Sequence, residues 1–154
     1  MRNTLKKFML AMAIMVTVAF AADNSLGTWK LNMEKSKFTP SAPVKSLTTT
    51  REASDDGVKV TTTGERADGT PINASYTAKY DGKEVPVTGA PYDSIAIKQV
   101  NANTLTAIQK NSGTKYSTTA RIVISKDAKT MTSTTRGTGA DGSPVNYRMV
   151  YEKQ

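Results

Sequence analysis

PINASYTAKY, residues 71–80, is the stretch that decides the fold. Its apolar and aromatic side chains stand at every second position: Ile72, Ala74, Tyr76, Ala78 and Tyr80. A period of two is typical of a β-strand with one buried face and one wet face. Similar alternation recurs in residues 58–63, 116–124 and 145–151. The pattern predicts an antiparallel sheet, since no window after the first 21 residues sustains a helical period.

Turn signals separate these runs at regular intervals. Asp-Gly pairs at 68–69, 81–82 and 141–142 favour hairpins, because both residues tolerate a positive φ. The spacing is typical of a meander of short strands. We predict nine strands: 27–33, 44–54, 58–67, 71–81, 94–101, 104–111, 114–125, 129–139 and 143–152.

Two segments break the alternation. Residues 34–43, EKSKFTPSAP, contain two prolines and predict a loop or one helical turn. Residues 83–93, KEVPVTGAPYD, predict an edge strand and then a loop, whose Tyr92 would suit contact with a partner protein. RADGTPIN at 66–73 also echoes GADGSPVN at 139–146. This echo indicates either two related hairpins or independent use of the same favourable turn.

The apolar face of the sheet needs a cover, and no amphipathic helix is available to provide it. Closure of the sheet on itself buries that face and removes the exposed edges. We therefore expect an all-β fold: an antiparallel up-and-down β-barrel of about eight to ten strands. Residues 22–154 form its single domain.

The first 21 residues predict a secretory signal helix. Arg2, Lys6 and Lys7 precede the uncharged run 8–20, and Ala19-Phe20-Ala21 fits a cleavage site after Ala21. That run is shorter than the roughly 18 residues that cross a bilayer, so no stable membrane anchor is expected after signal removal. We expect a bacterial protein that is periplasmic or secreted.

The absence of certain residues restricts the chemistry. The chain has neither histidine nor cysteine, which removes disulfides, the commonest general base and the commonest transition-metal ligand. No Gly-x-Ser-x-Gly is present, so we expect no enzyme, no metal and no cofactor. Residues 22–154 carry 18 basic and 13 acidic residues, a net +5, spread along the chain without a run. Nucleic acid is therefore not an expected partner.

GTWKLN, residues 27–32, resembles the Gly-x-Trp pattern on the first strand of lipocalins and of the wider calycin group. In that family the Trp closes one end of the barrel, and an Arg from a late strand packs across its ring. The resemblance assigns barrel closure to Gly27 and Trp29, with Arg148 favoured as the arginine. Most of the chain after residue 21 also resembles small exported bacterial barrel proteins, a resemblance that brings no catalytic residues.

The predicted inner face mixes aromatic rings with hydroxyl groups. A cavity lined in this way would contact an apolar ligand and orient it by hydrogen bonds. The candidate ligand-binding residues are Tyr76, Tyr80, Tyr116, Tyr147, Arg51, Thr62 and Thr118. Arg51 is expected either at a strand end in water or at the barrel mouth, where it could pair with an acidic headgroup.

Two non-enzymatic functions remain open at this stage, beside the less favoured hypothesis of an unrecognised enzyme. The first is an exported carrier of a small, partly apolar molecule. The second is a structural or protein-interaction barrel with a filled interior. A cavity of roughly 300 Å³ or more would separate them. The oligomeric state stays open.

Overall fold

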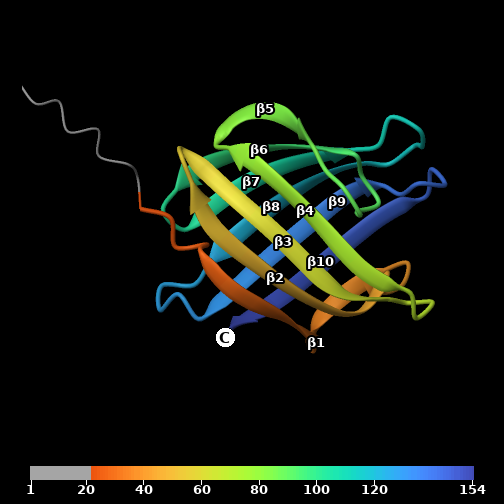
Figure 1. Cartoon of the computed structure of the whole chain (residues 1–154). Coiled ribbons are helices and arrows are strands. Elements are labelled where there is room, and N and C mark those ends of the chain that lie inside the picture. The colour runs from red at the N-terminus through yellow and green to blue at the C-terminus, as the bar shows by residue number, and fades with distance from the viewer. Residues whose placement is uncertain (1–21) are drawn as a thin grey trace, which may run out of the picture.

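The computed structural model describes residues 22–154 and consists of ten antiparallel strands (Figure 1). The strands are β1 (Gly27–Thr39), β2 (Val44–Ser54), β3 (Gly57–Arg66), β4 (Pro71–Lys79), β5 (Asp81–Pro86), β6 (Ser94–Asn101), β7 (Thr104–Lys110), β8 (Ser117–Ile124), β9 (Thr130–Thr138) and β10 (Pro144–Lys153). The predicted signal helix lies outside the described residues. Within them, no helix is long and apolar enough to cross a membrane.

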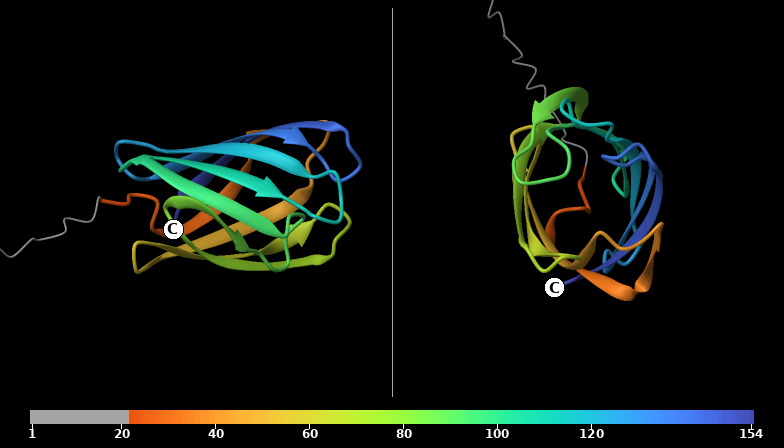
Figure 2. Two further views of the ribbon diagram at one scale, coloured as in Figure 1. Left: turned by 90° about the horizontal axis from the view of Figure 1, so that it is seen from above. Right: turned by 90° about the vertical axis from the view of Figure 1, so that its right-hand side faces the viewer.

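The strands form one sheet in the order β4-β3-β2-β1-β10-β9-β8-β7-β6-β5. Each strand pairs with its neighbours in sequence, except that β4 does not pair with β5, and β1 also pairs with β10, so the sheet curls into a barrel (Figure 2). The predicted all-β, up-and-down barrel of eight to ten strands is confirmed. Its ring is nearly closed, with one break between β4 and β5.

The loop after β5 crosses this break. Ser75 on β4 and Thr88 in the loop exchange two backbone hydrogen bonds, with N···O distances of 3.1 and 3.2 Å. The predicted edge strand and loop within 83–93 therefore correspond to β5 and to this bridging segment. The strand count rises from the predicted nine to ten because β5 forms a full strand.

The expectation of a loop or helical turn at 34–43 is wrong for its first six residues, because β1 continues to Thr39 through a bulge. Asn32 lies opposite Val150, and Lys37 lies opposite Arg148. Five steps along β1 thus correspond to only two steps along β10. The Ser36 hydroxyl donates to the Asn32 carbonyl (2.6 Å) and accepts the Val150 amide hydrogen (3.0 Å). A side chain thus satisfies a backbone donor that the interrupted ladder would otherwise leave unpaired.

The two echoing sequences form hairpins with the same hydrogen bonds. In the β3–β4 turn, the Thr70 amide donates to Asp68 Oδ1 at 2.9 Å. In the β9–β10 turn, the Ser143 amide donates to Asp141 Oδ1 at 2.9 Å. Glycine follows the aspartate in both turns, with φ values of 88° and 90°. The repeated sequence therefore corresponds to one turn conformation used twice. Two related hairpins and independent use of the same favourable turn would both explain it.

Residues 22–26, which we call the N-terminal strap, close one end of the barrel. The end-on view of Figure 2 shows this segment within the outline of the ring. The Asn24 amide donates to the Ala102 carbonyl (3.0 Å), and its side-chain amide donates to Asn103 Oδ1 (2.7 Å). Gln99 Nε2 donates to the Ala22 carbonyl at 3.0 Å. The strap thus ties the start of β1 to β6 and the β6–β7 turn.

Candidate ligand cavity

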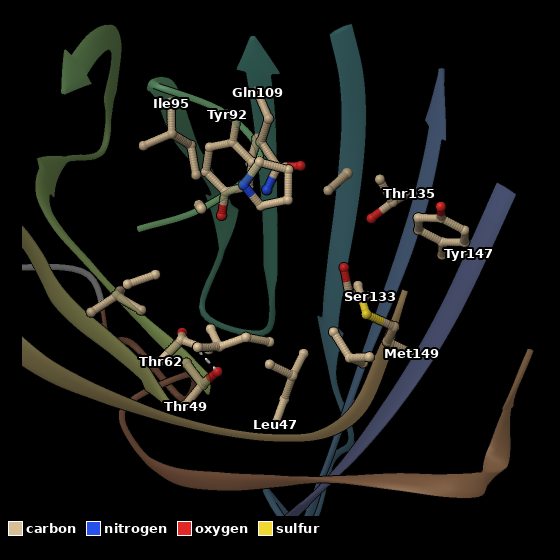
Figure 3. A pocket seen from close by; sticks show the side chains of 18 of the residues that line it. Leu47, Thr49, Thr62, Tyr92, Ile95, Gln109, Ser133, Thr135, Tyr147 and Met149 are labelled. Atoms are coloured by element: carbon tan, nitrogen blue, oxygen red, sulfur yellow. Dashed lines mark hydrogen bonds between the residues drawn. The ribbon is translucent and has the colours of Figure 1, made fainter. Parts of the chain in front are cut away.

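The barrel encloses a cavity of about 240 Å³ (Figure 3). This volume is below the roughly 300 Å³ expected from the sequence as the mark of a hollow barrel. The interior is thus neither filled nor large enough for a bulky ligand. Most of its wall is apolar, with hydroxyl and amide groups interspersed; the polar lining residues include Thr49, Thr62, Gln109, Ser133 and Thr135.

The cavity reaches the turns at the end of the barrel opposite the strap. Pro43 from the β1–β2 turn, Arg66 from the end of β3 and Pro91 from the β5–β6 loop contribute to the lining there. Pro43 and Pro91 are exposed to solvent, whereas Ser25 of the strap is 1% exposed. The cavity therefore has a wet rim at one end and a sealed floor at the other.

Five of the seven predicted ligand-binding residues line this cavity: Arg51, Thr62, Tyr76, Tyr116 and Tyr147. Tyr80 does not, because its hydroxyl donates to Asp23 of the strap at the closed end. Thr118 is 2% exposed, and its hydroxyl donates to Gln109 Oε1 at 2.8 Å. Tyr80 therefore holds the strap in place, and Thr118 orients an amide of the lining.

The sequence interpretation missed Tyr92, Gln109 and Tyr151, which also line the cavity. The sequence suggests partner contact for Tyr92, but its ring turns inward and stacks on Tyr116 with centroids 5.9 Å apart. Tyr151 is 6% exposed. The two-residue period of β10 places Tyr151 in phase with Tyr147, so alternation alone could have identified it. Tyr92 lies in a loop and carried no such signal.

Arg51 is the buried cation of the cavity. It lies on β2 at 4% exposure, and its Nε donates to the Ser25 hydroxyl of the strap at 3.1 Å. Within residues 22–154, its Nη2 is buried without a hydrogen-bond partner. The expected position of Arg51 at the barrel mouth is wrong: the residue lies at the sealed floor, because β2 approaches the strap there.

The surroundings of Arg51 keep its charge in place. Burial lowers the pKa of its guanidinium, but Tyr76, Tyr80 and Asp23 act in the opposite direction and the net shift is upward. Burial, together with the hydrogen bond to Asp23, raises the pKa of Tyr80 to about 12. Burial also raises the pKa of Tyr151. At neutral pH the floor therefore presents the positive charge of Arg51 among neutral phenols, with the carboxyl group of Asp23 close by on the strap.

Trp29 is fully buried on β1 beside the strap, and its Nε1 donates to the Ser25 carbonyl at 2.8 Å. The cation over its ring is Lys153, whose Nζ lies 5.4 Å from the centroid. The choice of Arg148 is therefore corrected to Lys153, which faces Trp29 directly in the β1–β10 register. Arg148 is exposed and donates to the Lys35 carbonyl in the β1 bulge at 3.2 Å.

The lining suits the binding of a ligand through contact, hydrogen bonds and charge. Thr49 and Thr62 share a hydrogen bond of 3.1 Å between their hydroxyls at the wall. Among residues 22–154, no cluster of three or more His, Cys, Asp or Glu side chains is placed to hold a metal ion. What the cavity offers is an apolar surface, several neutral donors and one buried cation.

No protein-family model matches the chain, and no curated protein matches it either. Solved structures do resemble it. A Schistosoma mansoni fatty acid binding protein in complex with arachidonic acid matches 87% of this chain and 98% of its own, with a TM-score of 0.57 and 17% identity. A zebrafish ileal bile acid-binding protein complexed with cholic acid matches 86% and 100%, with a TM-score of 0.50 and 14% identity. At such identities the likeness shows the fold alone, a nearly closed antiparallel β-barrel.

Proposed function

We propose that this protein is an exported, non-enzymatic carrier that holds one small, partly apolar anion in its barrel. The observation that carries the proposal is Arg51: a buried guanidinium with an unpartnered Nη2, in the lining of an otherwise largely apolar cavity. A buried charged donor without an acceptor costs free energy that an incoming anion would recover.

The apolar wall would supply the rest of the affinity. Burying ligand surface against side chains such as Ile72, Ile95 and Met149 contributes roughly 25 cal/mol per Å². The neutral hydroxyls of Thr49 and Thr62 could fix orientation without favouring a second charge. The volume of about 240 Å³ favours a compact ligand, such as a medium-chain or single-ring acid.

The comparisons support a binding role. Two barrels of the same fold are fatty acid and bile acid-binding proteins by name, and the ligands in those complexes, arachidonic acid and cholic acid, are both acids. Neither is named as an enzyme. From these proteins we infer only that the ligand of this chain is an acid, and not which acid it is.

The test is a matched pair of ligands that differ in charge. Decanoate and decanol share a ten-carbon chain, but only decanoate carries an anion. We expect decanoate to bind about tenfold or more tightly than decanol, since a hydrogen bond to a charged group contributes about 1.5–3 kcal/mol. Trp29 fluorescence would report binding, because the indole shares Ser25 with Arg51.

The Arg51→Met variant should lose the preference for decanoate and keep the affinity for decanol. Lys59→Met is the matched control, since Lys59 is exposed on β3. Equal binding of both ligands by the unaltered protein would contradict the anion site but would leave the carrier function standing. Failure of both ligands to bind, with no small molecule retained in native mass spectrometry, would favour the structural barrel with a filled interior.

A further inference from the structure

The charges of the chain are segregated between the two halves of the barrel. Residues 22–93 contain nine basic and ten acidic residues, a net −1, whereas residues 94–154 contain nine basic and three acidic residues, a net +6. The second half comprises β6–β10, the green-to-blue strands of Figure 1. Strands β6–β9 carry no acidic residue at all, and β10 carries Glu152 only. The two halves hold equal numbers of basic residues, so the net positive charge of the second half comes from its shortage of acidic residues.

The strand register aligns the basic residues on the outer face. Lys98 lies opposite Thr106, which lies opposite Arg121. The same row continues through Thr134 to Arg148 and then to Lys37 on β1: Arg121↔Thr134, Thr134↔Arg148 and Arg148↔Lys37. All four basic residues are exposed. Since neighbouring strands lie about 4.8 Å apart, positive charges recur roughly every 10 Å from Lys98 through Arg121 to Arg148, and Lys37 lies one strand beyond Arg148.

Exposed apolar side chains lie on the same face. Among the described residues, three large hydrophobic side chains are markedly exposed: Val100 (57%), Ile108 (46%) and Val123 (39%). Each lies two residues from a member of the row on β6, β7 or β8, and therefore points to the same side of the sheet. Arg136 on β9 adds another exposed positive charge beside them. We call Lys98, Arg121, Arg136, Arg148, Val100, Ile108 and Val123 the basic face.

We propose that the basic face docks the barrel onto an anionic phospholipid bilayer. Basic side chains gain from the negative potential of such a surface, and aliphatic side chains among them gain from insertion at the headgroup boundary. A nucleic acid would interact favourably with the basic side chains only and not with the exposed aliphatic ones. The outer positions of β6–β9 hold no aromatic ring on which bases could stack. This docking is independent of what the cavity holds.

The experiment is co-sedimentation of the chain with phosphatidylcholine vesicles, prepared with and without phosphatidylglycerol. We expect binding only to the anionic vesicles, and we expect it to fall as salt is raised. The double variant Arg121→Gln/Arg136→Gln should weaken binding about 25-fold, at roughly fivefold for each charge near the surface. Ile108→Ser should weaken it further without changing the dependence on salt.

The matched control is Lys59→Gln/Lys83→Gln, which removes the same charge from exposed positions on β3 and β5. It should change vesicle binding less than about twofold. Equal losses in the two double variants would show that total charge acts and would overturn the proposal. So would an absence of vesicle binding, or binding to DNA that is tighter than binding to anionic vesicles. Thermal unfolding of every variant confirms that the barrel is intact, and Lys98→Gln/Arg148→Gln replaces any face variant that fails to fold.

Discussion

Buried tyrosine hydroxyls make the stability of this protein sensitive to alkaline pH. Burial is the main cause that raises the pKa of Tyr80, to about 12, and it also raises the pKa values of Tyr92 and Tyr151. A group whose pKa is higher in the folded state than in the unfolded state stabilises fully below the unfolded value, about 10 for tyrosine. That contribution is lost as pH rises through the folded value. We expect stability to decline from about pH 10 to 12.

The measurement is the urea midpoint as a function of pH. Since the chain has no histidine, the midpoint should be nearly constant between pH 5 and 8. Tyr80→Phe should lower stability at neutral pH, because Asp23 loses a donor, and should reduce the alkaline decline. An unchanged alkaline slope in Tyr80→Phe would mean that the Tyr80 hydroxyl ionises equally easily in the folded and unfolded chains.

Single residues show which part of the site alternation can predict. Tyr76, Tyr116 and Tyr147 were assigned to the interior by their phase on a strand, and all three line the cavity. Phase gives the side of the sheet but not the depth along the barrel axis. Arg51 was therefore assigned to the correct face and the wrong end, because its depth depends on a strap that contacts it through Ser25.

Among the elements, the loop that bridges the break between β4 and β5 depends on a glycine. Gly89 has a φ of 76°, and a Cβ added there would lie 2.0 Å from the Asn73 carbonyl oxygen on β4. The loop can therefore approach β4 closely enough for the Ser75–Thr88 bridge only without a side chain at position 89. We expect Gly89→Ala to destabilise the barrel by about 1–3 kcal/mol in urea unfolding.

Gly82→Ala is the matched control. Gly82 has a similar φ of 74°, but an added Cβ there would meet nothing within 4 Å. It should show only the backbone cost of a positive φ, about 1 kcal/mol. The excess in Gly89→Ala measures the closing contact, and amide exchange of Ser75 and Thr88 should accelerate in that variant alone. Equal losses in the two variants would mean that the bridge contributes nothing to stability.

The elements also show which structure is encoded by nearby residues and which depends on residues far away in the sequence. The β3–β4 and β9–β10 hairpins were predicted because Asp-Gly encodes its turn within a few residues. The extension of β1 to Thr39 was missed, since residues 34–39 do not alternate. They join the sheet because the Ser36 hydroxyl accepts the Val150 amide hydrogen and residues 37–39 pair with β10, a strand that begins more than a hundred residues later.

For the whole molecule, closure of the sheet was predictable, because one apolar face had no helix to cover it. Lys153 was not identified as the partner of Trp29, since the family resemblance indicated an arginine and the choice depends on the β1–β10 register. The strap had no sequence signal either. It is only five residues long, and the roles of Asp23, Asn24 and Ser25 come from contacts with the β4–β5 corner, the β6–β7 turn and β2.

The strap yields the prediction at this scale. Without residues 22–26, Trp29 Nε1 and Arg51 Nε lose Ser25 as their partner, while the rest of the barrel keeps its strands. A buried donor left unpaired costs about 1–3 kcal/mol, whereas the hydrogen bonds at the strap's own ends are largely offset by the entropy of ordering five residues. Because two donors lose their partner, we expect a chain that starts at Gly27 to be less stable by about 2–6 kcal/mol than one that starts at Ala22. Its Trp29 emission should shift to the red as water reaches the indole.

Asn24→Ala in the chain that starts at Ala22 isolates the outer attachment of the strap. It removes the 2.7 Å bond to Asn103 and leaves Ser25 in place. It should cost only about 0.5–1.5 kcal/mol and leave the emission of Trp29 unchanged. If the chain that starts at Gly27 keeps both its stability and its emission, the closed end is sealed by β1 and Trp29 alone. The floor around Arg51 would then form without the strap.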